Sequence, residues 1–142
     1  MQIQSSLLTS SAWIVLALFI AGAVGCGGGE QVVPVSGVVT LDDKPLPQTQ
    51  VVFYVEGAGP ELNYTAITDA QGHFELQNVK TREPGLRPGM YQVTLSTGFA
   101  GPDTLETDPI PKELIPAKAQ QQQFEVPADS EVEANFDVRS KG

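Results

Sequence analysis

Apolar and polar residues alternate along most of the chain beyond residue 31. In residues 131–139, EVEANFDVR, every second residue is apolar and the residues between them are polar or charged. Successive side chains of a strand point to opposite faces of a sheet, so a period of two predicts strands with one buried face. The residues expected on buried faces are Val51, Phe53, Val55, Phe74, Leu76, Tyr91, Val93, Leu95, Val132, Ala134, Phe136 and Val138.

Short turn sequences separate the alternating segments. The sequence TDAQG, residues 68–72, predicts a tight hairpin with Gly72 at a positive φ, and LDDKPLP, residues 41–47, predicts a bend. No segment after residue 31 has a sustained helical period. Strands separated by turns every 8–12 residues or so are typical of sandwiches. We therefore expect an all-β fold, a single antiparallel Greek-key β-sandwich of six to eight strands.

The first 29 residues differ in character from the rest of the chain. They contain no Asp, Glu, Lys, Arg or His, and residues 13–24 are an unbroken apolar run. A run of this length is shorter than the roughly 20 residues that cross a bilayer as a helix. It matches the hydrophobic core of an export signal, which has about 7–15 residues.

The single cysteine, Cys26, follows this apolar run directly in the sequence AVGC. The segment resembles a bacterial lipoprotein signal, in which small residues precede a lipidated cysteine. The resemblance implies that residues 1–25 are a lipoprotein signal peptide, that Cys26 carries lipid, and that residues 26–31 form a flexible tether. Two alternatives stay open: an ordinary signal peptide cut beside Ala23 or Gly25, and an uncut anchor helix from about Leu7. All three place residues 30–142 outside the cytoplasm.

The charged residues all lie beyond the apolar leader. The chain carries 17 acidic and 8 basic residues, for a net charge of −9. This balance repels phosphate backbones, and the sequence has no basic cluster to offset it. We therefore expect no nucleic-acid partner.

Three sequence segments resemble the carboxypeptidase regulatory-like, transthyretin-like β-sandwich domains. They are VSGVVTLDDKPLPQTQVVFY (35–54), TDAQGHFEL (68–76) and RPGMYQVTL (87–95), and residues 114–138 further resemble the closing segment of small planctomycete-type lipoproteins. The resemblance implies a domain over residues 32–140. Asp43 and Gln48 stand where this family commonly has glycine, so we expect Asp43 to adopt left-handed geometry.

The inventory of reactive side chains argues against catalysis. One cysteine cannot form an internal disulfide, and His73 is the only histidine. The zinc peptidases and hydroxyisourate hydrolases that occur beside the resembled fold need several histidines, and serine hydrolysis needs a base. Asp69 with Asp42 or Asp43 is a weak calcium candidate, because such side chains mostly cap their own turns. We expect a non-enzyme with no cofactor, no catalytic residue and no metal site.

The sequence points to a role in contact rather than chemistry. We expect a structural or adhesive module, anchored to the membrane through Cys26, with an envelope protein or glycan as partner. The alternative is carbohydrate or peptide binding through exposed aromatics, for which Tyr54 and Tyr64 are the candidates. The long connection 98–123 is either a site or, as favoured here, a strap that buries Ile110, Leu114 and Ile115.

Overall fold

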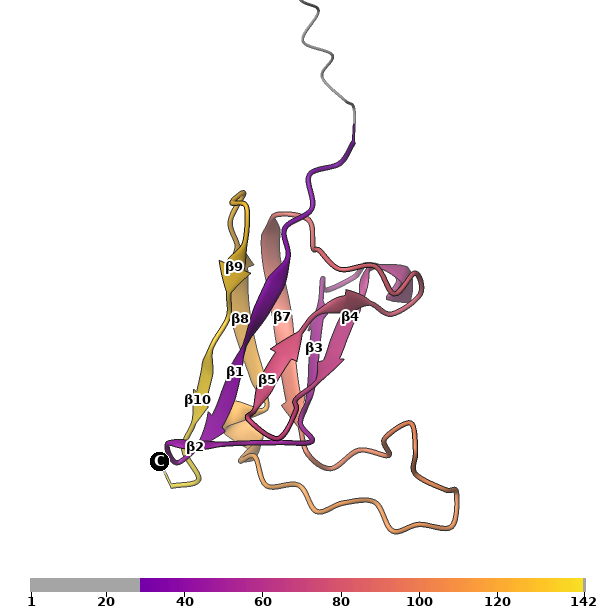
Figure 1. Cartoon of the computed structure of the whole chain (residues 1–142), viewed down its shortest axis with the longest axis vertical. Helices are drawn as coiled ribbons and strands as arrows, with labels where there is room; N and C mark the ends of the chain where they lie inside the picture. Colours follow the sequence, from indigo (N-terminus) through magenta and orange to yellow (C-terminus); the bar gives the residue numbers. More distant parts are fainter. Residues whose placement is uncertain (1–28, 142) are drawn as a thin grey trace, which may run out of the picture.

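The alternating segments form two β-sheets that pack face to face (Figure 1). The computed structural model describes residues 29–141. The strands are β1 (Val35–Leu41), β2 (Lys44–Pro45), β3 (Gln50–Tyr54), β4 (Tyr64–Ile67), β5 (His73–Glu75), β6 (Gln77–Asn78), β7 (Gly89–Ser96), β8 (Gln121–Val126), β9 (Val132–Glu133) and β10 (Phe136–Val138), with 3-10 turns at η1 (Pro60–Leu62) and η2 (Ala117–Ala119). The predicted all-β sandwich is confirmed.

The first sheet is built around β1. This strand pairs antiparallel with β2 and β5, and parallel with β9 and β10. The parallel pairs are a feature that the expected antiparallel sandwich did not include. They arise because the chain leaves β8 in the second sheet, crosses over, and then runs beside β1 in the same direction as β1.

The second sheet is antiparallel throughout, in the order β6-β4-β3-β7-β8. Its central pair joins β3 to β7 from Gln50↔Ser96 to Tyr54↔Gln92. The longest register of the sheet joins β7 to β8, from Gly89↔Val126 to Thr94↔Gln121. As a result, β8 is the edge strand on one side and the short β6 is the edge on the other.

Residues 131–139 keep the predicted alternation but do not form one continuous strand. The strand is interrupted between β9 and β10, where the Asn135 side-chain oxygen accepts a hydrogen bond from the Val38 N–H at 2.9 Å. The Ala134 N–H donates to the Ser36 carbonyl at 2.8 Å. Gly37 lies against this break, and a Cβ placed there would sit 1.9 Å from the Ala134 oxygen. Only glycine allows the two segments to approach this closely.

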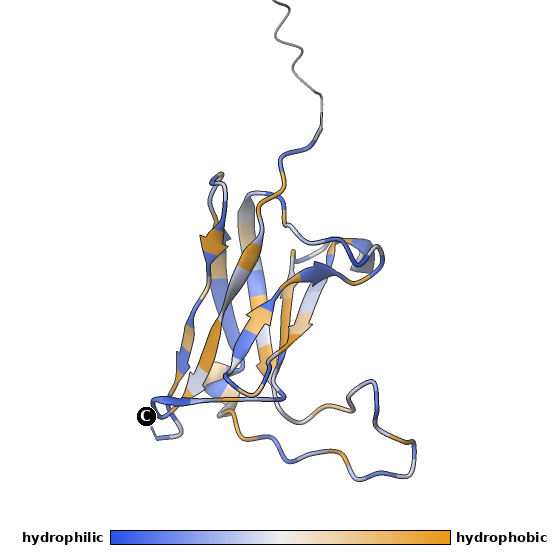
Figure 2. Ribbon diagram, in the orientation of Figure 1, coloured by the Kyte–Doolittle hydropathy of each residue, from blue (hydrophilic) through white to orange (hydrophobic). Residues whose placement is uncertain are grey.

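The core lies between the sheets, and Figure 2 shows apolar and polar residues alternating along the strands. Every residue expected on a buried face is buried except Val55, which lies beyond the end of β3 and is 38% exposed. Phe53 of the second sheet lies 6.1 Å from Phe136 of the first, measured between ring centroids. Phe124 lies at the same distance from Phe136, so aromatic rings bridge the two layers.

The turns behave as the sequence indicated. Gly72 has φ +73° and Asp43 has φ +67°, both in the left-handed region. Asp43 also binds the Arg139 guanidinium at 2.5 and 2.7 Å, which fastens the β1–β2 turn to the C-terminal segment. This hydrogen bond lowers the pKa of Asp43.

Several expectations concern residues that the structure does not describe. The signal peptide 1–25, lipidated Cys26 and the first residues of the tether 26–31 lie outside residues 29–141. Within the described part of the chain, no helix has the length and apolar character needed to cross a membrane.

The close approach at Gly37 leads to a first prediction. Gly37→Ala forces a methyl group against the Ala134 carbonyl, so we expect it to destabilise the domain by about 3 kcal/mol or more. Equilibrium urea unfolding followed by circular dichroism measures the change. Gly29→Ala is the matched control, because nothing lies within 4 Å of a Cβ at Gly29. Equal stability of the two variants would contradict the packing described here.

Candidate functional site

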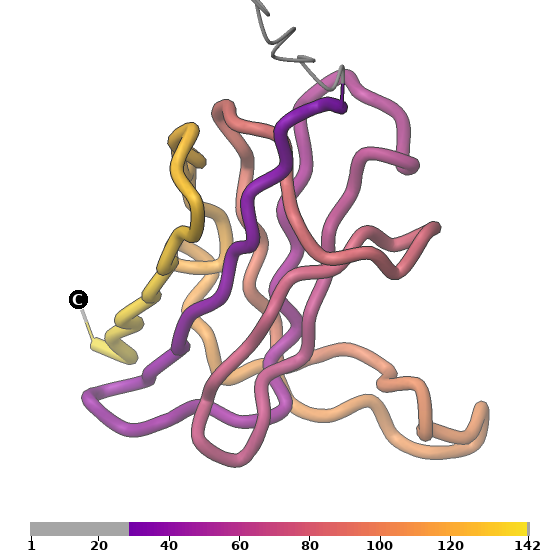
Figure 3. The backbone as a smooth tube through the Cα atoms, turned by 45° about the horizontal axis from the view of Figure 1, so that its top comes forward, coloured from indigo at the N-terminus to yellow at the C-terminus, as the bar shows by residue number. Residues whose placement is uncertain are grey.

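The long connection after β7 is a protruding loop rather than a strap along the sandwich (Figure 3). Ile115 is buried at 2% exposure, as expected, but Ile110 is 66% exposed and Leu114 is 49% exposed. The expectation that all three pack on the domain is therefore wrong for Ile110 and Leu114. Four prolines at residues 102, 109, 111 and 116 deny this segment the backbone N–H groups that a strand would need.

One carboxylate fastens the base of this loop to the end of β7. Glu113 accepts hydrogen bonds from the Ser96 hydroxyl at 2.6 Å and from the Thr97 hydroxyl at 2.9 Å. Backbone N–H groups of Thr97, Gly98 and Ile115 donate to the same carboxylate. The Thr97 hydroxyl in turn accepts a hydrogen bond from the Leu114 N–H at 2.7 Å.

These hydrogen-bond donors lower the pKa of Glu113. Partial burial alone would raise the pKa of Glu113, but the hydrogen bonds from Ser96, Ile115 and Thr97 outweigh it and lower the pKa from 4.5 to about 2. The carboxylate is therefore charged at neutral pH and serves as a structural acceptor. The base of the loop is fixed, while its tip presents Leu105 and Ile110 to solvent.

The two tyrosines expected as exposed binding residues differ in their exposure. Tyr64 is only 6% exposed, so the expectation that it is an exposed aromatic is wrong. Its ring packs edge-on against Tyr91, with centroids 6.1 Å apart. Tyr54 is half-buried, with its side chain on the outer side of the second sheet. Tyr64 starts β4 on the inward-facing register, which the short and irregular sequence around it did not reveal.

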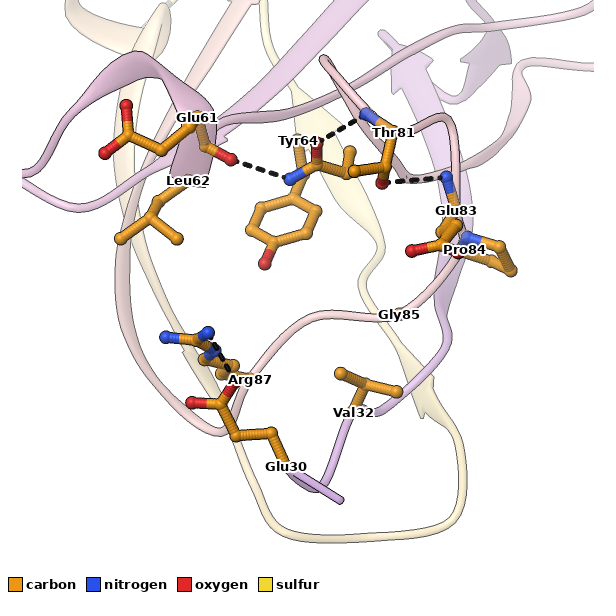
Figure 4. A pocket seen from close by; sticks show the side chains of 11 residues that line it. Glu30, Val32, Glu61, Leu62, Tyr64, Thr81, Glu83, Pro84, Gly85 and Arg87 are labelled. Atoms are coloured by element: carbon orange, nitrogen blue, oxygen red, sulfur yellow. Dashed lines mark hydrogen bonds and ion pairs between the residues drawn. The ribbon is translucent and has the colours of Figure 1, made fainter. Parts of the chain in front are cut away.

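A hollow of about 600 Å³ lies at the end of the domain where the chain enters (Figure 4). Figure 4 shows the Tyr64 ring pointing into it, with Glu61 on one side and the bound pair of Glu30 and Arg87 across from it. The Tyr91 hydroxyl donates to the Arg87 carbonyl at 2.9 Å, and burial, aided by nearby Tyr64, raises the pKa of Tyr91 to about 12.

Sequence reasoning missed this hollow because its walls come from separate segments of the chain. The hollow carries the carboxylates of Glu30, Glu61 and Glu83 and the guanidinium of Arg87, and it opens to solvent. In the described structure, every buried side-chain polar atom has a hydrogen-bond partner. The hollow therefore contains no buried polar side-chain atom without a hydrogen-bond partner.

The outer faces of the two sheets differ sharply in charge. The outward residues of β5, β9 and β10 include His73, Glu75, Glu133 and Asp137, and Arg139 follows directly. We call this surface the charged face. A second hollow of about 420 Å³ on it is lined by Ser36, His73, Glu131 and Glu133 among others. Within residues 29–141, no hydrogen bond joins the His73 imidazole to Ser36 or to these carboxylates.

Of the strand residues on the outer side of the second sheet, Glu125 alone is charged. Beside the strands, the Glu113 carboxylate binds the Ser96 hydroxyl, and Glu75 and Arg82 line a hollow with Gln50, Thr65 and Gln77. The strand residues form rows across the sheet: Ile67–Gln50–Ser96, then Gln77–Thr65–Val52–Thr94–Gln121, then Tyr54–Gln92–Gln123, and finally Met90–Glu125. The strand residues of this surface thus carry amide, hydroxyl and apolar groups, with Glu125 at its corner as the exception. We call it the neutral face, and it is the candidate binding surface of the domain.

The carboxylates considered for calcium do not come together. Asp69 accepts hydrogen bonds from the N–H groups of Gln71 and His73 at 2.9 Å, so it caps its own turn. Asp42 accepts from the Ser140 hydroxyl, and Asp43 binds Arg139. Among residues 29–141, no three His, Cys, Asp or Glu residues are grouped so as to hold a metal ion.

Comparison with known proteins adds little to this picture. No family model matches the chain, and no curated protein matches it. Among solved structures, it is similar to a DUF3823 family protein from Parabacteroides merdae ATCC 43184, with 16% sequence identity and a TM-score of 0.43. The match covers 78% of this chain and 47% of that one, so the chain spans about half the length of that protein. A likeness at this level carries no argument about function.

The environment of Glu113 leads to a second prediction. Glu113→Gln removes a charged acceptor of several hydrogen bonds, so we expect a loss of about 1–3 kcal/mol at neutral pH. Because the folded-state pKa is lowered, the stabilisation is present above the ordinary value of 4.5 and is lost as the pH falls through about 2. Urea unfolding at a series of pH values measures the difference between wild type and variant. A difference that does not shrink below pH 4.5 would exclude this role for the carboxylate.

Proposed function

We propose that the chain is an exported, lipid-anchored and non-catalytic module that adheres to a component of the bacterial envelope through its neutral face. The single observation that carries the proposal is the separation of charge between the two outer faces. Charged side chains are costly to remove from water, and the cores of protein interfaces are depleted of them. A surface on which the residues of four strands carry no charge, in a chain of net charge −9, is suited to being covered.

The position of the chain entry supports an anchored arrangement. The described chain enters at the end of the sandwich where β1 and β7 begin (Figure 1), and Glu30 binds Arg87 just before β7. Cys26 is four residues before Glu30. A lipid on Cys26 would hold this end near the membrane, since acyl chains bind a bilayer at about 0.8 kcal/mol per buried CH₂. The strands lead away from this end of the domain. Most of the neutral face, which extends along the strands, would therefore lie at a distance from the membrane surface.

Support for a non-catalytic role comes from the surroundings of the one histidine. His73 lies on an exposed strand edge of the charged face, with its backbone held by Asp69. Within residues 29–141, no side chain is hydrogen-bonded to its imidazole in a way that would orient the ring as a general base. We further propose that the domain belongs with the carboxypeptidase regulatory-like sandwiches, on the strength of the strand and turn segments 35–54, 68–76 and 87–95.

A second candidate function is recognition of a neutral carbohydrate on the same face. Tyr54 lies next to Gln92, and Gln92 lies next to Gln123, so one aromatic ring is flanked by a row of amides. Sugar rings stack on aromatic side chains, and amides can donate to and accept from their hydroxyl groups. This candidate differs from adhesion to a protein by its dependence on Tyr54.

The anchor is tested by the intact mass of the protein isolated from membranes. We expect a chain that begins at Cys26 and carries lipid, and a chain longer by residues 1–25 after treatment with globomycin, which blocks the lipoprotein signal peptidase. Cys26→Ser should carry no lipid. An unmodified chain cut beside Ala23 or Gly25, or a chain that retains its leader without treatment, would instead establish one of the two alternatives.

The neutral face is tested by placing a single charge on each outer face. We expect Gln92→Glu to weaken binding of chain-bearing vesicles to isolated envelope fragments about tenfold, because a covered charge loses its hydration. Ser36→Lys, which places its single charge between Glu75 and Glu133 on the charged face, is the control and should bind like wild type. Binding to a glycan array that disappears with Tyr54→Ala would favour the carbohydrate function. Equal binding of the Gln92 and Ser36 variants would reject the neutral face as the contact surface.

A further inference from the structure

Strand β8 has one edge that no other described strand covers. It pairs with β7 over its whole length, from Gln121 to Val126, and with no other strand. No proline lies within β8, and Glu125 is its one charged residue. Natural sheets usually protect an exposed edge with charges, prolines, bulges or short length, and β8 has few of these features.

The unpaired backbone groups on this edge can be assigned. The Gln120 carbonyl accepts a hydrogen bond from the Leu95 N–H at 2.9 Å, so Gln120 directs its backbone toward β7. The N–H and C=O groups of successive residues point to opposite sides of a strand, so those of Gln122, Phe124 and Val126 also point toward β7. The N–H and C=O groups of Gln121, Gln123 and Glu125 therefore point outward, and no hydrogen bond within the described residues uses them.

The other edges of the sandwich are shorter or interrupted. β6 has two residues, and its Gln77 is bridged by Pro84. β5 has three residues. The β9–β10 edge is broken at Ala134 and Asn135, where the Asn135 side chain takes the place of a strand partner for Val38. Of the edges that the structure describes, β8 is thus the one that offers a straight run of six residues.

We infer that β8 pairs antiparallel with β8 of a second copy of this chain. The two-fold register that pairs all three outward residues places Gln123 opposite Gln123 of the second copy and Gln121 opposite Glu125 of the second copy. Each carboxylate then lies opposite an amide, and the two Glu125 side chains are separated by about 14 Å along the strands. Like charges therefore do not face one another, as cross-strand pairing requires.

The same register joins the two neutral faces. Residues directly opposite in an antiparallel pair project from the same face of a sheet. Gln121, Gln123 and Glu125 belong to the outer side of the second sheet, so pairing continues the neutral face from one copy into the next. The second copy is favoured over an unrelated strand because this glutamine-rich edge supplies both sides of a charge-compatible pair.

Antiparallel pairing also sets the direction of the two anchors. Val126, at the end of β8, pairs with Gly89, and nearby Leu86 bridges Val33, so β8 ends at the same end of the domain as the chain entry. A partner strand that runs the opposite way carries its chain entry at the opposite end. If both copies are lipid-anchored, which rests on the proposed function, the pair links two facing membrane surfaces and does not join neighbours on one membrane.

The register is tested by single cysteines in the full chain, oxidised in membranes of expressing cells. Gln123→Cys should give a disulfide-linked dimer, because residues opposite in a hydrogen-bonded pair have Cα atoms about 5.5 Å apart. Gln121→Cys should give at least tenfold less dimer, since its own counterpart lies about 14 Å away. The wild-type chain controls for any thiol at Cys26. Equal cross-linking at residues 121 and 123 would overturn the pairing.

Charge exchange tests whether the contact bridges membranes. Vesicles that carry the wild-type chain should cluster in light scattering. Vesicles that carry only Gln123→Lys or only Gln123→Glu should cluster at least tenfold less, and a mixture of the two variants should recover clustering. Circular dichroism confirms that both variants fold. Failure of the mixture to recover would overturn the proposal, whereas a chain found without lipid but cross-linked at residue 123 would overturn only the anchor.

Discussion

The packing of aromatic rings between the two sheets is the contact on which the rest of the structure depends. Phe53 and Phe124 of the second sheet both meet Phe136 of the first, and Phe74 stacks on Phe136 from within the first sheet. With one cysteine in the chain, no internal disulfide can hold the layers together. Burial of apolar surface must therefore supply the stability, at about 25 cal/mol per Å² removed from water.

This packing explains why the sheets have two such different outer faces. Every second side chain of each strand is buried in the core. The side chains between them lie on the outer face, and core packing does not restrict their type. On the first sheet they include Glu75, Glu133 and Asp137, which keep that surface hydrated. On the second sheet they are almost all uncharged, so this surface loses little hydration when another molecule covers it. Packing of the core requires neither charged nor uncharged residues on the outer faces. The difference between the two faces therefore bears on function.

The two ends of the sandwich are also distinct. The chain enters at the end that carries the Glu30–Arg87 pair, and the long loop leaves from the opposite end, where Glu113 fastens its base. The loop lies at the end opposite the chain entry. The neutral face and the open β8 edge run along the strands that lead away from the entry. Adhesion needs such an arrangement, because a surface held against its own membrane could not reach a partner.

The sequence alone determined the fold class, most of the core and two of the special backbone positions, Gly72 and Asp43. These follow from local patterns: a period of two shows which side chains are buried, and a turn needs particular residues such as Gly72 and Asp43. It failed at Val55, Tyr64, Ile110 and Leu114, where the ends of strands and the course of a loop decide exposure. Only the tertiary structure decided the parallel pairing of β9 and β10 with β1, the hollow around Arg87 and the free edge of β8. Each of these depends on which distant segments lie side by side, and local alternation of residues carries no information about that.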